Sequence, residues 1–576
     1  MITAALLLAT AGVVAPPATA KFPDGSRVEW RRGEAPVVLI TPKRGEGWLA
    51  LASRVTGNAH LANELRVANG QAGQPLYRIP VRVPWQLVRP ELRVAAARAL
   101  FSDDRRTAAG WEHVIVAPWG GDGESWWELA EWFTGDGANY PRLREANPDL
   151  GLFPPKGVRI VIPASVLRAE FRAAGIETRA AAPVATPAPP AKPGPRPTAP
   201  VAAARSAEGA LAYGEEEAVY RLRPGEALYS AVVVRFTGQL HASDVNATAA
   251  EIARRSLIGD VAAIPVGYPV RIPFDMLLPE YLPPGHPRRV AWEKEREQLA
   301  GIKRIIRAAN LDGIHIILDA GHGGADTGAI AGQAWESTYA YDVMVRVKRV
   351  LEQQTRATVW TTIQDPERTS REAEEDVLPA RRSQRLLVDP PYGLGDPVVG
   401  VTLRWILGDS ILARLQRRKV DSERVVFVSI HADSLHPSVR GLMVYVPARS
   451  LRPTRAPWPE GLPDCREVRS FRPPSFPARF RSRSEALSGQ LGEALVHAAR
   501  IAGVAVHAYE PVRSSVMRGG SRWVPAVLRY SSVPSAVLVE ICNLNNEQDH
   551  ALLLTRRFRE QLAHAIAAGL AEGFTR

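Results

Sequence analysis

The sequence predicts an α/β fold in which a C-terminal three-layer sandwich, with a mainly parallel sheet flanked by helices, follows several small βααβ modules. From about residue 313 to 576, short apolar runs typical of buried strands alternate with helical segments, as in parallel sheets covered by helices. Upstream, one strand–helix–helix–strand pattern occurs three times. The chain of 576 residues is too long for a single core, which agrees with several domains.

The first twenty residues, 1–20, are predicted to form a secretory signal peptide. Residues 4–14 form an apolar run that is too short to cross a membrane. Ala18-Thr19-Ala20 then fits the small-residue site at which such a peptide is cleaved, although no Lys or Arg precedes the apolar run. We therefore expect an exported protein of the periplasm or the extracellular cell envelope, with no transmembrane segment in the mature chain.

Three repeats of one pattern are expected at residues 36–88, 112–167 and 218–275. In each, an apolar helical stretch ends on a Thr-Gly step, and the unit closes on a short strand that runs into a proline. This order resembles the LysM module, a small βααβ fold, and Pro224-Gly225-Glu226 in the third repeat is similar to the opening turn of that family. The resemblance implies binding to the glycan strands of peptidoglycan. Folded spacers that have lost sugar binding are the alternative.

Residues 173–212 are predicted to be a Pro/Ala-rich linker between the second and third repeats. Their composition prevents a packed core and favours an extended, semi-rigid spacer. Such a spacer would let the catalytic part move relative to the first two repeats.

Charge and cysteine content narrow the function classes. The formal net charge is +12, which favours polyanionic partners such as an anionic cell-wall polymer. The arginines are scattered, and no basic run with interleaved aromatic residues marks a nucleic-acid module, so nucleic acid is not an expected partner. Cys465 and Cys542 are too few for a disulfide framework, and they leave open one bridge or two free thiols.

The region 313–576 is predicted to alternate strands and helices. Apolar or β-branched runs predict strands at 315–319, 358–362, 425–430, 442–446 and 536–541. A charged helical lead-in is expected at 290–310. Further helical segments are expected at 343–351, 486–502 and 549–574. Ligand sites in sheets of this kind lie at the carboxyl ends of the strands.

Polar residues occupy those strand ends. His322 follows the first strand within Gly321-His322-Gly323-Gly324, Glu336 stands at the start of a helix, and His431 and Glu540 end two later strands. Two histidines and one carboxylate are a known ligand set of catalytic zinc, which keeps one position open for water. A further carboxylate must take the proton of that water and return it to the leaving group. We therefore predict one Zn²⁺ ion held by His322, Glu336 and His431, with Glu540 as the catalytic base and acid.

Four motifs in order give the region 313–576 a resemblance to the zinc N-acetylmuramoyl-L-alanine amidases of the Amidase_3 family. They are Leu318-Asp319-Ala320-Gly321-His322-Gly323-Gly324, then Glu336, then Ser429-Ile430-His431-Ala432-Asp433, and then Pro534-Ser535-Ala536-Val537-Leu538-Val539-Glu540. The resemblance implies zinc ligands at the first three positions and the catalytic carboxylate at the last. It also implies a peptidoglycan substrate, with hydrolysis of the amide bond between the lactyl group of N-acetylmuramic acid and L-alanine.

Two other functions remain open from the sequence: a catalytically silent peptidoglycan-binding or activator protein, and a zinc peptidase that cuts within the stem peptide. Cys542 and Asn543 replace the Gly and the aromatic residue that are usual in the family, which puts the local pocket in doubt. The stretches 365–424 and 448–483 are longer than the family pattern leads us to expect. In some relatives an inserted element covers the zinc until a protein partner removes it, so our hypothesis is that one of these stretches gates the site and that a protein activator exists.

Overall fold

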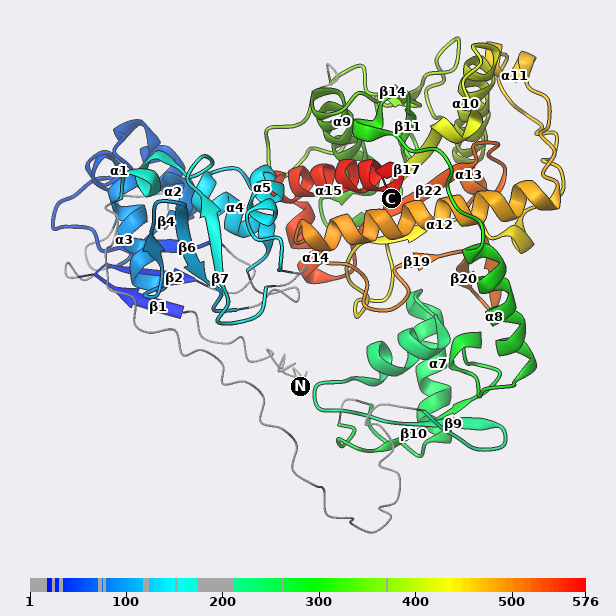
Figure 1. Cartoon of the computed structure of the whole chain (residues 1–576), viewed down its shortest axis with the longest axis horizontal. Coiled ribbons are helices and arrows are strands. Elements are labelled where there is room, and N and C mark those ends of the chain that lie inside the picture. The colour runs from blue at the N-terminus through cyan, green and yellow to red at the C-terminus, as the bar shows by residue number, and fades with distance from the viewer. Residues whose placement is uncertain are drawn as a thin grey trace, which may run out of the picture. The chain divides into compact units, whose positions relative to one another are not determined.

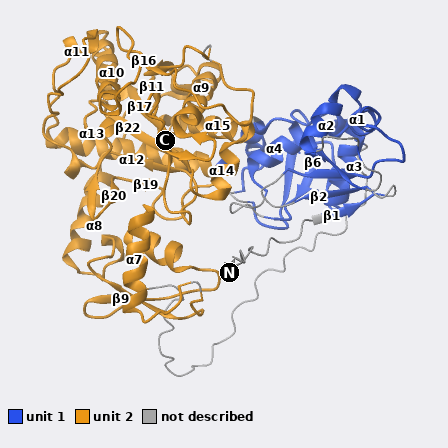
Figure 2. Ribbon diagram, turned by 180° about the vertical axis from the view of Figure 1, so that it is seen from behind, with its two compact units in different colours: residues 1–189, 501–503 blue, residues 190–500, 504–576 orange. Residues whose placement is uncertain are grey.

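The computed structural model describes residues 18–22, 26–30, 35–70, 75, 79–117, 124–150, 154–174, 211–261, 263–368 and 371–575. The chain divides into two compact units, residues 1–189 with 501–503 and residues 190–500 with 504–576 (Figure 2). Most of the predicted signal peptide and of the predicted linker lies outside the described residues. Ala18 to Ala20, where cleavage is predicted, belong to strand β1 (Ala18–Lys21).

In each repeat, two helices lie between two strands along the chain, and the two strands pair antiparallel, in the order that the sequence predicts (Figure 1). The strands are, in the three repeats, β3 (Val37–Ile40) with β4 (Val81–Pro84), β6 (Gly110–Val114) with β7 (Arg159–Pro163), and β9 (Glu217–Arg221) with β10 (Pro269–Pro273). The helices are α1 (Trp48–Thr56) with α2 (Ala62–Ala68), α4 (Trp126–Thr134) with α5 (Tyr140–Glu145), and η4 (Leu228–Thr237) with α7 (Ala242–Arg255).

One strand just before each repeat was not predicted. It pairs antiparallel with the opening strand, and it is β2 (Arg27–Trp30), β5 (Arg105–Arg106) or β8 (Ala212–Tyr213). β5 and β8 are two residues long, too short to show a periodic pattern, whereas β2 alternates polar and buried apolar residues over four positions. The second opening strand also begins at Gly110, before the predicted start of its repeat at residue 112.

The Thr-Gly step has the same structural role in all three repeats. Gly57, Gly135 and Gly238 follow the first helix with φ values of 79°, 85° and 71°. This left-handed conformation closes a helix, and only glycine adopts it without a steric cost. The repeated Thr-Gly step therefore recurs because it ends the first helix of each repeat.

A polar side chain at the end of the second helix also recurs. Asn147 donates to the carbonyl oxygens of Leu143 and Val161 at 2.6 and 2.8 Å, and its own carbonyl accepts from the Val161 N–H at 2.8 Å. Asn69 makes the equivalent bonds in the first repeat. In the third repeat, Ser256 Oγ accepts from the Arg271 N–H at 2.8 Å. This side chain satisfies backbone groups of the closing strand that have no strand neighbour.

The C-terminal region contains a six-stranded sheet in the order β14-β11-β17-β22-β18-β19. Its strands are β11 (His315–Ala320), β14 (Thr358–Thr361), β17 (Val425–Asp433), β18 (Met443–Tyr445), β19 (Val512–Arg513) and β22 (Ser535–Asn543). The first four in sheet order run parallel, whereas β18 is antiparallel to β22. The predicted mainly parallel sheet is confirmed, and β17 and β22 extend further than predicted, through the polar residues at their ends.

Helices cover both faces of this sheet. Helix α10 (Pro397–Arg417) packs closely on one face: a Cβ added to Gly408 would lie only 3.2 Å from the Phe427 ring. Helix α12 (Ala478–Ile501) approaches the other, since a Cβ on Gly492 would lie 3.3 Å from Val444. The register Val444–Val539–Ile430 puts Val444 on the face opposite to Phe427. Helices α9 (Glu336–Gln354) and α15 (Arg556–Thr575) complete the layers.

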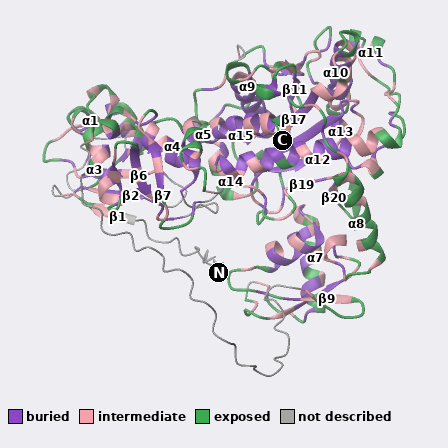
Figure 3. Cartoon of the chain, viewed as in Figure 1, coloured by how far each residue is buried: buried purple, intermediate pink, exposed green. Residues whose placement is uncertain are grey.

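Burial agrees with this layering. The central strands are buried, whereas helix α8 (Pro287–Ala300), which leads into the catalytic region, has no buried residue (Figure 3). Within the described ranges, none of the helices combines the length and the apolar character that a membrane span requires.

Candidate metal and catalytic site

The register of the parallel strands brings the predicted site residues to one edge of the sheet. His431 of β17 and Glu540 of β22 are direct register partners, so their side chains leave neighbouring strands on the same side. Ala320 ends β11 opposite Ile430, and the chain then turns through Gly321 to His322. Glu336 is the first residue of α9. Residues that are far apart in the sequence thus meet at the carboxyl ends of β11, β17 and β22.

His322, Glu336 and His431 form a cluster whose ligand atoms all lie within 4.8 Å of one another. Glu336 Oε1 lies 3.2 Å from His322 Nε2 and 3.0 Å from His431 Nδ1. Glu336 is buried and its carboxylate accepts the backbone N–H groups of Ala329 and Ala432 at 2.8 and 3.1 Å. The two histidines remain partly exposed, which leaves the cluster accessible from solvent.

Two glycines make room for these side chains. A Cβ on Gly321 would lie 2.1 Å from Cε1 of His431, and a Cβ on Gly328 would lie 2.5 Å from Oε2 of Glu336. Both distances are far below van der Waals contact, so no other residue fits at either position without moving a ligand side chain. Glycine is thus required here by close approach.

The His322 backbone is held by a buried ion pair that the sequence did not reveal. Arg404 of α10 pairs with Asp319 and also donates to the carbonyl oxygens of Ala320 and His322. Asp319 is fully buried and accepts further bonds from Thr362 and, at 2.6 Å, from Ser429. His322 itself has a φ of 62°, which is unfavourable for a residue other than glycine. The Arg404–Asp319 pair therefore fixes a strained turn that aims His322 at the cluster.

Asp326 orients the His322 ring. Its Oδ2 lies 2.9 Å from His322 Nδ1, while His322 Nε2 faces Glu336. A hydrogen bond to one ring nitrogen selects the tautomer and leaves the other nitrogen for a metal. This contact gives Asp326 an orienting role.

Two more acidic side chains lie near the cluster without partners. Oδ2 of Asp433 and Oε2 of Glu540 are buried and have no hydrogen-bond partner among the described residues. Burial, followed by the neighbouring Glu336 carboxylate, raises the pKa of Asp433 to about 8. Burial together with Asp433 and Glu336 raises the pKa of Glu540 well above its usual range. Buried carboxylates of this kind require a cation nearby or must bind protons.

The electrostatics of the cluster fit a divalent cation. Burial disfavours the charged form of His322, but Glu336 and Asp326 outweigh this effect and raise the pKa of His322 to about 10. The site therefore stabilises positive charge strongly. Two nitrogen donors and one carboxylate oxygen, with solvent access, are the donor set of a catalytic zinc site.

The first part of the stretch 448–483 leads away from this site. Strand β18 begins at Met443, the register partner of Glu540, and runs towards the beginning of β22. Beyond it, Arg452 donates to the carbonyl oxygens of Arg529 and Ser531, which precede β22. Further along, Glu467 accepts from the Asp389 N–H at 2.8 Å, and the Phe471 ring packs on Trp405 of α10. The gating hypothesis therefore stays a prediction for this stretch.

The stretch 365–424 lies against the His322 loop instead. The Ala325 N–H donates to the Leu394 carbonyl at 3.0 Å, and the Gly324 N–H donates to the Gln384 side chain at 3.3 Å. The same stretch supplies Arg404. These contacts make it a support of the ligand loop.

The two cysteines are free and buried, so the bridge that the sequence left open does not form. Cys542 and Asn543 belong to β22, directly after Ile541. Asn543 holds a neighbouring loop through bonds to Leu435, His436 and Val439. Asn543, one of the two departures from the family pattern, thus holds this loop in place.

Residues 316–572 match the sequence model of the Amidase_3 family, described as N-acetylmuramoyl-L-alanine amidase, which is less than half of the chain. The amidase Ami1 from Mycobacterium smegmatis is 18% identical; the match covers 46% of this chain and 99% of that chain, with a TM-score of 0.29. AmiC2 of Nostoc punctiforme is 21% identical over 46% and 98% of the two chains, with a TM-score of 0.28.

A third solved structure is the CwlD amidase from Clostridioides difficile in complex with the GerS lipoprotein. It is 18% identical over 46% of this chain and 98% of that chain, with a TM-score of 0.28. No curated protein matches the chain.

Proposed function

We propose that this protein is a zinc-dependent N-acetylmuramoyl-L-alanine amidase, which hydrolyses the amide bond between the lactyl group of N-acetylmuramic acid and L-alanine in peptidoglycan. The amidase family match over 316–572 supports the reaction. The observation that carries the proposal is the convergence of two histidines and one carboxylate within 4.8 Å, beside a buried glutamate at the neighbouring strand end.

His322, Glu336 and His431 would hold one zinc ion. Asp326 fixes the His322 ring through Nδ1, and the backbone N–H groups of Ala329 and Ala432 fix the Glu336 carboxylate. When bound, zinc supplies Lewis-acid activation of the scissile carbonyl and of the attacking water.

Glu540 is proposed to move the proton. It is buried next to His431, and its Oε2 has no hydrogen-bond partner among the residues that the structure describes. A carboxylate in such a position accepts a proton from the attacking water and returns it to the nitrogen of the leaving alanine. The products are a free lactyl carboxylate on the glycan and a peptide with a free amino end.

The three repeats are proposed to be LysM-like modules that bind glycan strands. Their support is the strand–helix–helix–strand order and the shared closing bonds of Asn69, Asn147 and Ser256. Several weak sites on one chain would raise the local concentration of enzyme on the wall. Export to the periplasm or the extracellular envelope follows from the substrate, and a protein activator is a further proposed partner.

Digestion of purified sacculi by the full-length protein tests this function. Mass spectrometry is expected to detect glycan with free lactyl carboxylates and stem peptides that begin with a free alanine. A cut between two amino acids of the stem would support the zinc peptidase instead. Release of nothing by a folded, zinc-loaded protein would support the catalytically silent wall-binding or activator protein.

A further inference from the structure

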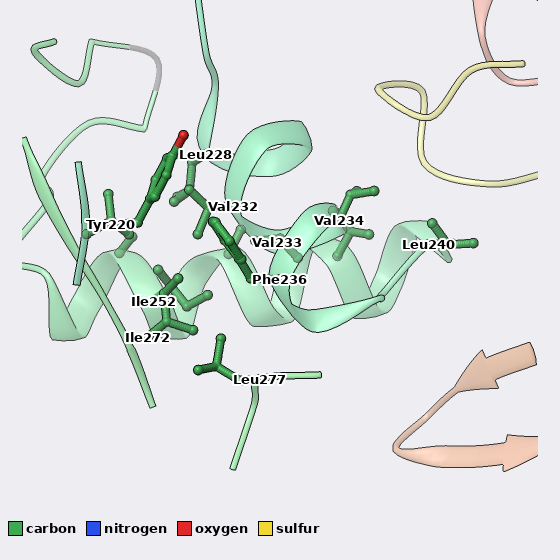
Figure 4. Close-up of a cluster of buried hydrophobic side chains, with 14 of the residues drawn as sticks. Tyr220, Leu228, Val232, Val233, Val234, Phe236, Leu240, Ile252, Ile272 and Leu277 are labelled. Carbon is green, nitrogen blue, oxygen red and sulfur yellow. The ribbon is translucent and has the colours of Figure 1, made fainter. Parts of the chain in front are cut away.

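The third repeat shares its hydrophobic core with the catalytic domain. Its buried side chains form one cluster with Leu435, Val439 and Met443, which are 7, 1 and 1% exposed. The first two belong to a loop, residues 434–442, that follows the strand of His431, and Met443 begins β18. Figure 4 shows the side chains that the repeat contributes, among them Phe236 and Leu240. Apolar residues next to the catalytic strands are thus buried together with the repeat.

Polar and aromatic contacts fix the position of the repeat on this loop. The His436 N–H donates to the Leu240 carbonyl at 2.9 Å, and the His436 ring stacks on Tyr229 with centroids 5.1 Å apart and an interplanar angle of 19°. At a second point, Asp244 of the repeat accepts from the Gly519 N–H at 2.8 Å. Backbone bonds of this kind depend on one orientation, so the contact is specific.

The other side of the 434–442 loop is attached to the catalytic strands. Asn543 accepts from the Leu435 N–H at 2.9 Å and donates to the carbonyl oxygens of His436 and Val439 at 3.0 and 2.8 Å. Asn543 is also the register partner of Asp433 in the pair of strands that carries His431 and Glu540. The loop is therefore held between the third repeat and the strand ends of the site.

We infer that the third repeat is a positioning part of the catalytic unit, which holds the 434–442 loop and through it the ends of β17 and β22, rather than a tethered module. This inference rests on the proposed amidase function and deepens it. The predicted linker 173–212 precedes the third repeat, so it separates only the first two repeats from the catalytic domain. Hydrolysis should therefore depend on the repeat even when the substrate is too small to reach it.

Two variants of the full-length chain test this. Leu240→Asp places a charge in the shared core, and Tyr229→Ala removes the stacking partner of His436 without adding a buried charge. Leu257→Asp is the matched control, because Leu257 lies in the same repeat but is 87% exposed. The first readout is hydrogen–deuterium exchange of the 434–442 loop, and the second is kcat on a soluble N-acetylmuramoyl-dipeptide.

Both interface variants are expected to exchange the loop amides faster and to lower kcat about 2- to 30-fold, the range of coupling through contiguous contacts. The Leu257→Asp control is expected to match the wild type in both readouts. If folded interface variants keep the wild-type kcat on the soluble dipeptide, or if the loop exchanges as in the wild type, the inference is overturned and the repeat acts only as a wall-binding module. An inactive wild type would refute the amidase function itself, whereas the exchange measurement would still decide whether the repeat holds the loop.

Discussion

Among the described residues, each unit contains a cluster in which histidine lies between or beside carboxylates. In the first unit, His113 lies between Asp104 at 2.8 Å and Glu124 at 3.5 Å, and all three side chains are 0% exposed. In the second, His322 and His431 flank Glu336, and these histidines are 26 and 16% exposed. The residue types are similar, but only the second cluster can be reached from solvent.

The carboxylates of the two clusters are satisfied in similar ways. Asp104 and Glu124 each accept a backbone N–H, from Val114 at 3.0 Å and Val116 at 3.1 Å. In the described part of the chain, one oxygen of Glu124 has no hydrogen-bond partner, and the same holds for one oxygen of Asp433 and one of Glu540 near the other cluster. An unpartnered buried carboxylate oxygen therefore does not by itself mark a metal site. The comparison teaches that solvent access, rather than residue type, separates the proposed metal cluster from the enclosed one.

The largest expected effect is on metal content. His431→Ala removes one of three ligands, and we expect the purified variant to lose its zinc and its activity. His113→Ala should leave the zinc content at the wild-type value, because all three side chains of its cluster are closed to solvent. Elemental analysis after dialysis measures both. Equal zinc loss in the two variants would contradict the assignment of the metal to the His431 cluster alone.

Glu540→Gln is expected to lower kcat about 10²- to 10⁴-fold, the usual contribution of a general acid–base group. Zinc content should remain, since Glu540 is not a proposed ligand. Glu547→Gln, a change of the same kind on a nearby exposed residue, is the control. A variant at position 540 that retains wild-type turnover would remove Glu540 from the mechanism.

The next effect concerns the stability of the first unit against pH. Burial disfavours charged His113, but Asp104 and Glu124 outweigh it and raise the pKa of His113 to about 9, above its ordinary value of 6.5. A raised pKa stabilises the fold fully below the ordinary value, and this contribution is lost as pH rises through the folded value. We therefore expect the unfolding free energy of this unit to fall by about 3 kcal/mol between pH 6.5 and 9.5.

Denaturant unfolding of the full chain across that pH range measures this loss. The slope should disappear in His113→Gln and persist in His60→Gln, where the histidine is exposed and belongs to the same unit. A wild-type curve that stays flat over this range would contradict the assigned protonation of His113.

The smallest effect concerns Arg404, which binds no ligand itself but holds the carbonyl of His322. Lysine cannot reproduce the forked contacts of arginine, so Arg404→Lys is expected to weaken zinc affinity about 10- to 100-fold. Arg417→Lys, on the exposed end of the same helix, is the control. Competition with a chelator measures the affinity. An unchanged affinity in Arg404→Lys would show that the strained turn at His322 holds without the ion pair.

Much of the catalytic sheet could be predicted from the sequence. Apolar runs such as 425–430 and 536–541 have the length and composition of buried strands, and the glycines around His322 mark a tight turn. The sequence also brought His322, Glu336, His431 and Glu540 forward as candidates, and the structure places them at one edge of the sheet. Their catalytic roles remain predictions.

Other features depend on contacts that leave no local pattern. Arg404 is one of 72 basic residues, and only the tertiary fold shows that it is buried against Asp319. The stretch 448–483 was a candidate gate because its length is unusual, but only the antiparallel register of β18 shows that its first part leads away from Glu540. The union of the third repeat with the 434–442 loop likewise joins segments that are about two hundred residues apart.

The burial of both cysteines has a practical consequence. Cys465 and Cys542 are the two thiols of the sequence, and both are enclosed by the fold. Trp458, in contrast, is 60% exposed. W458C would therefore place one reactive thiol on the outside, where a maleimide dye could follow the enzyme as it arrives on isolated cell walls.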